Sequence, residues 1–167
     1  MRRVHRYFEQ GDTIFFTHVT YHRQAILLEN VDLIWRAIDN QKTRSPFELI
    51  AWVVLPDHLH LLMNPLNNKP GDLMKRIKLS FAAHYRKRMS LKSGRVWQNR
   101  YWDHIIRDET DMNRHVDYIH YNPVKHGLTE SPMGYEHSSF ALFLRDGFYE
   151  RNWGTTDLAF GEESFGE

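Results

Sequence analysis

Two histidines one residue apart stand inside an apolar run of the chain. His58 and His60 belong to the segment VVLPDHLHLLM, and both would point to one face of a strand because side chains alternate along it. Two neutral imidazoles on one face are able to bind a single divalent cation. Because a His-x-His pattern is short, the alternative is a pair of exposed or hydrogen-bonded histidines without a metal.

A tyrosine and an asparagine four residues apart offer a candidate nucleophile and a candidate third ligand for such a cation. Tyr118 and Asn122 would share one face of a helix, about one turn apart. A tyrosine hydroxyl is a nucleophile toward phosphorus, and an amide oxygen is an acceptable ligand for Mg²⁺ or Mn²⁺. Together with the two histidines, Asn122 would leave coordination positions open for a phosphate oxygen. Tyrosine has a high pKa, so Tyr118 needs a base, a metal ion or both.

Other residues of the same stretch compete for these roles. Tyr121 is a second candidate nucleophile, but it lies about 60° away around the helix and has Lys125 at i+4 in place of a ligand. Lys125 would neutralise a phosphate or protonate a leaving oxygen, or it is a solvated lysine after a helix end. His115 is a candidate to orient Tyr118. We expect three histidines to lie at the surface or around the site rather than to bind the cation: His115, His120 and His126.

The formal net charge of +1 hides an uneven distribution of charge. Residues 69–100 carry ten basic residues and one acid, whereas residues 145–167 carry two basic and six acidic residues. Aromatic rings, among them Phe81, Tyr85 and Trp97, stand between these cations. Cations interleaved with stacking rings are typical of proteins that bind single-stranded or distorted nucleic acid. The alternative is an ordinary solvated helix face.

This basic stretch and the N-terminal residues supply the candidate contacts to DNA. Trp97 would stack on a base and Gln98 would hydrogen-bond a base edge, but neighbours on a strand cannot both face the DNA. The alternative for Trp97 is a core position. A basic arm at residues 1–12 would reach into a groove or hold a single strand, or else lie loose. The expected DNA contacts are Arg2, Arg3, Lys75, Lys78, Arg86, Arg95, Trp97, Gln98, Arg100, Tyr101 and Lys125.

Hydrophobic periodicity predicts the elements that position these residues. Strands are expected at residues 14–21, 47–55, 58–63 and 96–107, and helices at 24–40, 73–89 and 110–121. Asp72 is the expected N-cap of the second helix, Asn122-Pro123 is expected to end or bend the third, and Gly127 to stop the chain there. The order predicts an α+β, ferredoxin-like fold: a four-stranded antiparallel sheet with helices on one face, followed by the helix of Tyr118.

Composition bounds the remaining possibilities. The chain has 167 residues and no cysteine, which excludes disulfides, thiolate zinc sites and cysteine nucleophiles. We expect one domain at residues 1–144 and an acidic extension at 145–167, which either folds back over the active site or lies loose. No apolar run is long enough for a membrane span and no secretory signal is seen, so we expect a cytoplasmic, nucleoid-associated protein without a membrane partner.

Three segments of the chain resemble a known family. The His-Leu-His run resembles the motif of HUH nucleases, and GDLMKRIKLSF (71–81), VWQNRYWDHIIRDE (96–109) and HVDYIHYNPVKHGL (115–128) are similar to REP-associated tyrosine transposases, which are bacterial proteins linked to repetitive extragenic palindromes. The resemblance spans roughly residues 13–140. It implies a ferredoxin-like fold and cleavage of single-stranded DNA that depends on Mg²⁺ or Mn²⁺.

The same resemblance assigns roles to individual residues. It implies that Tyr118 is the nucleophile and forms a 5′-phosphotyrosine, that His58 and His60 are metal ligands, and that Asn122 takes the third-ligand position, where many insertion-sequence relatives have Gln. The DNA would be a hairpin with a short single-stranded flank. Both a monomer and a homodimer with exchanged helices fit this family.

Two other functions use the same residues. A hairpin-binding regulator that does not cut DNA would need the basic stretch but neither Tyr118 nor a metal. A rolling-circle replication initiator would use two tyrosines on one helix, and Tyr118 and Tyr121 share a face poorly at a spacing of three.

Overall fold

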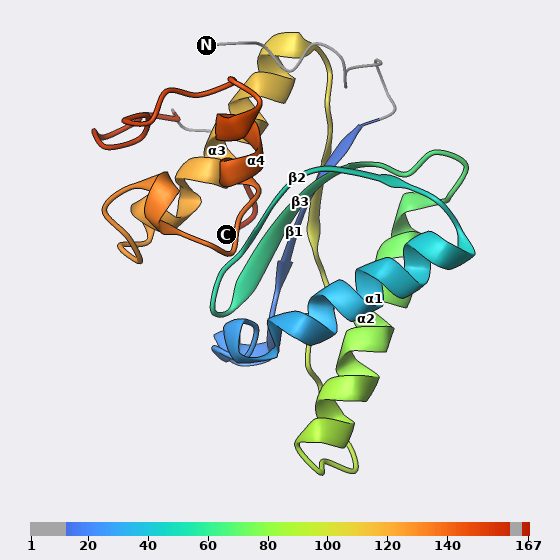
Figure 1. Ribbon diagram of the computed structural model, residues 1–167. Helices are drawn as coiled ribbons and strands as arrows, with labels where there is room; N and C mark the ends of the chain where they lie inside the picture. Colours follow the sequence, from blue (N-terminus) through green and yellow to red (C-terminus); the bar gives the residue numbers. More distant parts are fainter. Residues whose placement is uncertain (1–12, 161–164) are drawn as a thin grey trace.

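Four strands pair into one antiparallel sheet with helices on both faces (Figure 1). The computed structural model describes residues 13–160 and 165–167. The strands lie in the order β2-β3-β1-β4 and comprise β1 Ile14–Val19, β2 Glu48–Val54, β3 His58–Asn64 and β4 Trp102–Ile105. The helices are α1 Val31–Arg44, α2 Pro70–Arg88, α3 Glu109–Lys125 and α4 Phe140–Arg145, with 3-10 turns η2 Tyr21–Arg23, η3 Leu28–Asn30 and η4 Pro132–Gly134. The ferredoxin-like α+β expectation is confirmed.

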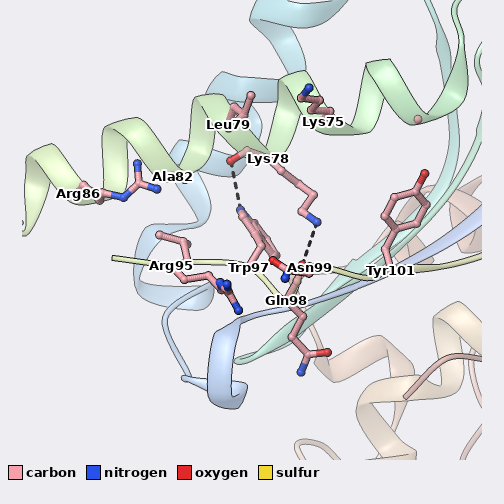
Figure 2. A pocket seen from close by; sticks show the side chains of 12 residues that line it. Lys75, Lys78, Leu79, Ala82, Arg86, Arg95, Trp97, Gln98, Asn99 and Tyr101 are labelled. Atoms are coloured by element: carbon pink, nitrogen blue, oxygen red, sulfur yellow. Dashed lines mark hydrogen bonds between the residues drawn. The ribbon is translucent and has the colours of Figure 1, made fainter. Parts of the chain in front are cut away.

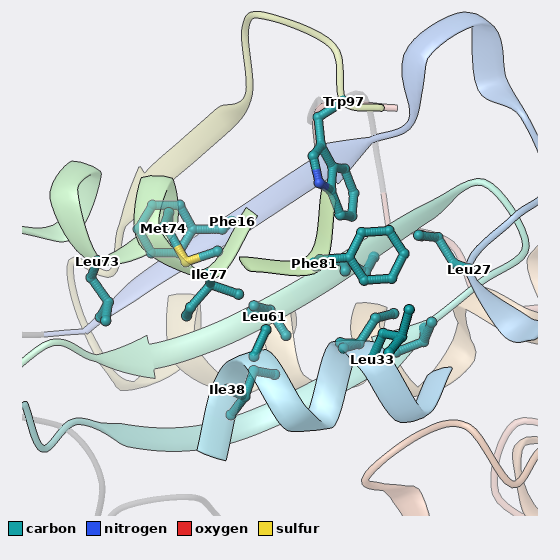
Figure 3. Close-up of a cluster of buried hydrophobic side chains, with 14 of the residues drawn as sticks. Phe16, Leu27, Leu33, Ile38, Leu61, Leu73, Met74, Ile77, Phe81 and Trp97 are labelled. Carbon is teal, nitrogen blue, oxygen red and sulfur yellow. The ribbon is translucent and has the colours of Figure 1, made fainter. Parts of the chain in front are cut away.

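Alternation along the strands divides the core into two clusters. Phe16 and Leu61 face α1 and α2, where they pack with Phe81 (Figure 3). Phe15 and Leu62 face the other way, toward α3 and the residues that follow it. Because His58 and His60 alternate with Leu59 and Leu61, the sheet turns both imidazoles toward α3.

The predicted first helix begins too early. Residues 24–27 connect η2 to η3, residues 28–30 form η3, and the α-helix starts only at Val31. His22 and Arg23 have φ values of 54° and 51°, in the left-handed region that breaks a helix. The apolar spacing over residues 24–30 thus belongs to a connecting segment and a 3-10 turn, which hydrophobic periodicity does not distinguish from an α-helix.

The predicted strand at 96–107 is also too long. Only Trp102–Ile105 pair with β1 along a ladder, and Trp97 forms an isolated bridge with Thr20. Between them the chain leaves the sheet because the indole of Trp97 turns toward α2, where Nε1 donates to the Lys78 carbonyl oxygen over 3.2 Å. This irregular segment, residues 95–101, becomes a wall beside α2.

The ends of α2 and α3 differ from the predictions. Lys69, not Asp72, is the N-cap of α2, and Pro70 opens the helix, where its missing N–H costs nothing. The helix α3 runs through Pro123 to Lys125 rather than ending before the proline. It continues because the N–H of His126 still reaches the Asn122 carbonyl over 3.0 Å, and Gly127, at φ 67°, then stops it as expected.

The acidic extension is partly packed. Phe148 and Tyr149 are buried in the cluster beneath α3 and α4, and Phe165 is buried there as well. Among the described residues, no helix has the length and apolar character needed to cross a bilayer.

Candidate active site

The face of β3 and the middle of α3 bring four predicted residues together. The His60 and Tyr118 rings lie 5.4 Å apart between centroids, and the His58 and His60 rings 5.2 Å apart. The amide nitrogen of Asn122 is 3.3 Å from Nε2 of His60. All four side chains are buried in the floor of one site, and all four come from one chain.

Hydrogen bonds behind the two histidines point their Nε2 atoms into the site. Asp57 Oδ1 lies 2.6 Å from Nδ1 of His58 and fixes a proton there. Thr17 donates its hydroxyl proton to the Phe165 carbonyl, so the Thr17 oxygen, 2.8 Å away, accepts from Nδ1 of His60. A proton on each Nδ1 leaves each Nε2 with its lone pair free for a metal ion.

Sequence reasoning missed Asp57 and Thr17. Asp57 directly precedes His58, which is a usable signal, since a carboxylate beside a ligating histidine is a common arrangement. Thr17 carries no such signal, because it reaches His60 only through the β1–β3 register.

The donor set fits a hard divalent cation. Within the described part of the chain, two buried polar atoms at this point lack a hydrogen-bond partner: His58 Nε2 and Asn122 Oδ1. A buried imidazole nitrogen and a buried amide oxygen without partners are costly unless something binds them. Histidine and amide oxygen are ligands suited to Mg²⁺ or Mn²⁺ rather than to a structural thiolate site.

A carboxylate from the far end of the chain lies where these groups converge. Oε1 of Glu167 is 2.9 Å from His60 Nε2, 3.7 Å from His58 Nε2 and 2.5 Å from Asn122 Nδ2, and it accepts a hydrogen bond from the Tyr118 hydroxyl. His58, His60 and Glu167 form a group of possible metal ligands. The structure thus places residues 165–167 over the site, one of the two arrangements considered for the acidic extension.

Phe165 completes the cover over the tyrosine. Its ring stacks on Tyr118 at 3.7 Å between centroids and 9° between planes. Glu167 is a site residue that the sequence does not reveal by any local pattern, and the only hint is the excess of acid in residues 145–167.

The charges in this cluster act strongly on one another. Burial, and then the neighbouring Glu167, raise the pKa of Tyr118 well above its usual range, so the hydroxyl keeps its proton while Glu167 is in place. Burial lowers the pKa of His60 to about 4. Although burial acts in the opposite direction, the neighbouring imidazoles of His126, His58 and His60 hold the pKa of Glu167 well below its usual range.

Lys125 is also part of the site. Its Nζ donates to the Tyr118 hydroxyl over 2.9 Å and to Glu167 Oε2 over 2.5 Å. His126 Nε2 lies 3.2 Å from the same Glu167 oxygen. The extra turn of α3 beyond Pro123 is what brings Lys125 to the tyrosine.

The competing candidates lie elsewhere. Tyr121 is buried against Phe160, 5.8 Å between ring centroids. His120 bonds to Tyr149 and Ser139 in the cluster beneath α4. The structure therefore offers Tyr118, and not Tyr121, to the two histidines.

A second histidine cluster beside the site is better explained by hydrogen bonds than by metal. His104, Asp111 and His115 are close enough to hold an ion. However, Nδ1 of His115 lies 2.9 Å from the Asp111 main-chain carbonyl and must carry its proton there, and the Arg107 guanidinium already neutralises the Asp111 carboxylate. The His115 ring stacks on His104 and makes inclined contacts with the rings of Phe15 and Phe165.

The expected DNA contacts divide between two faces of the sheet. Lys125 lies at the tyrosine, and Arg100 is exposed close to β4. Arg2, Arg3 and the rest of the predicted basic arm lie outside the described residues. The other seven line one pocket between α2 and the 95–101 segment: Lys75, Lys78, Arg86, Arg95, Trp97, Gln98 and Tyr101.

Comparison with known proteins identifies the family. The family described as Transposase IS200 like matches residues 13–122. A REP-associated tyrosine transposase of Escherichia coli K12 is 34% identical over 165 residues, which cover 97% of this chain and 98% of that protein. The chain belongs to the REP-associated tyrosine transposases.

A solved relative supports the same conclusion for the fold. The structure of a REP-associated tyrosine transposase bound to a REP hairpin matches this transposase with a TM-score of 0.76 and 34% identity, over 98% of this chain and 99% of that one. This transposase is therefore a DNA-processing enzyme whose sheet and helices follow the plan of that relative.

Proposed function

We propose that this transposase binds hairpin DNA and cleaves its single-stranded flank with Tyr118 as the nucleophile, in a reaction that needs Mg²⁺ or Mn²⁺. One observation carries the proposal: the Tyr118 hydroxyl, both histidine Nε2 atoms and the Asn122 amide meet at one point, now filled by Oε1 of Glu167. That point takes an anionic oxygen, as a scissile phosphate would offer. The hairpin-bound relative supports the choice of DNA.

The residues present define the steps of the reaction. His58, His60 and Asn122 would hold the cation, which when bound withdraws charge from a phosphate oxygen. Tyr118 Oη forms a bond to phosphorus while the bond from phosphorus to the 3′ oxygen breaks. The tyrosine proton passes to solvent, and the freed 3′ oxygen takes one from solvent. The product is a 5′-phosphotyrosine with a free 3′-hydroxyl, and the reverse reaction rejoins a strand.

Lys125 has a defined part in this chemistry. Its ammonium already donates to the Tyr118 oxygen, so it stabilises the negative charge that develops on that oxygen and on the phosphate. Since Tyr118 and the histidines belong to one chain, we infer that a single protomer cleaves in cis, without exchange of α3 between two copies.

A covalent adduct assay tests the proposal. A labelled hairpin with a single-stranded flank is incubated with protein and Mn²⁺ or Mg²⁺, and denaturing gels report protein–DNA adducts. We expect adducts with the unaltered protein and with Tyr121→Phe, none with Tyr118→Phe, and none in the presence of a chelator. An adduct that persists in Tyr118→Phe overturns the assignment of the nucleophile.

The position of Glu167 in the site favours one alternative function. With its carboxylate in the site, the protein would act as a hairpin-binding regulator that does not cut DNA. In that case neither the unaltered protein nor Glu167→Gln forms an adduct with either metal, while hairpin binding is unaffected by chelator. The rolling-circle initiator is disfavoured, because Tyr121 packs against Phe160 away from the histidines.

A further inference from the structure

A pocket of about 470 Å³ opens on the face of the sheet opposite Tyr118 (Figure 2). One wall is α2 and the other is the irregular 95–101 segment. The wall is firmly built: Trp97 is only 8% exposed, packs on Phe81, and is tied to the Lys78 carbonyl by its indole N–H. Catalysis at Tyr118 uses none of these residues, so their arrangement needs another explanation.

The pocket is cationic on all sides. Lys75, Lys78 and Arg86 come from α2 and Arg95 from the opposite wall, and none of the described residues that line the pocket is acidic. Lys78 is held between two rings, with Nζ 5.8 Å from the Trp97 centroid and 5.6 Å from that of Tyr101, and burial lowers its pKa. Converging cations without a carboxylate partner attract a phosphate.

The floor of the pocket is apolar. Of the apolar residues that line the pocket, Ala82 and Val96 are buried, whereas Leu79, among the cations of α2, is 57% exposed. A DNA duplex hides its bases and presents phosphates, so its contact surface needs no concave apolar floor. An unpaired nucleotide presents both a base, which gains from apolar and aromatic contact, and a phosphate.

The edge strand β4 connects this pocket to the active site. Tyr101 lines the pocket, whereas its neighbour Trp102 faces the other side, 5.8 Å from Phe15 between ring centroids. The exposed Arg100 stands at the same edge. A single strand passing over β4 would therefore meet both sites in turn.

We propose that this pocket binds an unpaired nucleotide of the DNA, with the base against Leu79 and the phosphate among the four cations. The inference rests on the proposed function, because it assumes that hairpin DNA with a single-stranded flank is the ligand. It adds a second DNA site that selects the flank on the face away from the reacting tyrosine.

Binding measurements in the Tyr118→Phe protein separate this inference from the chemistry. Fluorescence anisotropy compares a flanked hairpin with a blunt hairpin of the same stem, for Leu79→Glu and for Leu142→Glu. Leu142 is a matched control, because it is 47% exposed on α4, on the other face. We expect Leu79→Glu to weaken the flanked hairpin at least tenfold and the blunt hairpin less than threefold, and Leu142→Glu to change neither beyond threefold.

A base analogue locates the nucleotide. With 2-aminopurine placed at each flank position in turn, we expect a fluorescence change at one position in the Tyr118→Phe protein, absent when Leu79→Glu is added. Equal weakening of both hairpins, or no weakening, overturns the pocket and leaves the chemistry standing. Absence of adducts with intact flank binding overturns the chemistry and leaves the pocket standing. If the protein binds neither hairpin, both fail.

Discussion

At the scale of single residues, the site depends on side chains that hold other side chains. Asp57 touches His58 and not the point where the ligands converge, yet it decides which nitrogen of the imidazole carries the proton. Arg23 in turn donates to the second Asp57 oxygen over 3.1 Å. The grouping of His58, His60, Tyr118 and Asn122 could be predicted from residue type and spacing, but the side chains that hold them could not, because these come from pairing between distant segments.

We therefore expect Asp57→Ala to weaken cation binding rather than abolish the reaction. Loss of such a support typically costs a metal site roughly 10–100-fold in affinity. The measurement is the Mn²⁺ concentration that gives half-maximal adduct, which should rise by that factor. Asp39→Ala, on the exposed side of α1, is the matched control and should leave it unchanged. An unaltered Mn²⁺ dependence in Asp57→Ala would show that the carboxylate has no such role.

His18 predicts a dependence of stability on pH. It is 1% exposed between the sheet and α2, and neither ring nitrogen has a hydrogen-bond partner among the described residues. Burial, followed by the charges of Lys78 and His60, holds the pKa of His18 well below 6.5 in the folded state. The unfolded chain therefore binds the proton more readily, and the free energy of unfolding falls as pH drops below about 6.5.

Replacing His18 with leucine should reduce this pH dependence of the free energy of unfolding. Urea unfolding of His18→Leu and of the unaltered protein at pH 7.5, 6.5 and 5.5 provides the comparison. The variant should lose less stability on acidification, by up to about 1.4 kcal/mol per pH unit below 6.5. Two parallel pH profiles would mean that His18 takes up its proton equally well in the folded and unfolded chain.

At the scale of elements, α3 shows what periodicity does and does not determine. The spacing of Tyr118 and Asn122 predicts their shared face, since it follows from helix geometry alone. The end of α3 was predicted wrongly, because Pro123 disfavours helix at the residue before it without forbidding it when packing holds the turn. The strand expected at residues 96–107 was also predicted too long. The alternation of apolar residues over 96–102 looks like that of a strand, but it arises in part because the Trp97 indole packs on α2.

Substitution of Gly127 tests how α3 ends. Gly127 ends α3 at φ 67°, and no atom of the described residues lies within 4 Å of the position that a Cβ would take, so a side chain there would meet backbone strain. Gly127→Ala should lower the free energy of unfolding by roughly 1–2 kcal/mol, and Gly127→Asn by less, because Asn tolerates this conformation. Thermal unfolding should show a lower Tm for Ala than for Asn. Equal Tm values for both variants would exclude a left-handed stop.

At the scale of the whole molecule, the sheet separates two tasks. Thr17 and His18 are neighbours on β1, yet Thr17 contacts the His60 ring and His18 lies under the α2 face. The sequence predicts the order of the elements along the chain and a four-stranded antiparallel sheet with helices on one face. It does not predict that Glu167 contacts His60, because a contact between segments 107 residues apart leaves no local pattern in either.

Glu167 either blocks the position of the phosphate or acts as a metal ligand, and the two roles predict opposite effects of its substitution. As a plug, its carboxylate occupies the place of the phosphate and repels it, so Glu167→Gln should raise the single-turnover rate of adduct formation, by about tenfold if the plug costs about 1.4 kcal/mol. As a metal ligand, the same substitution should lower the rate and raise the Mn²⁺ requirement. We expect the increase, because Phe165 also covers Tyr118 and Oε1 accepts a hydrogen bond from the Tyr118 hydroxyl, which a metal ligand in a competent site would leave free. Glu150→Gln, exposed in the same acidic extension, is the matched control and should leave the rate unchanged.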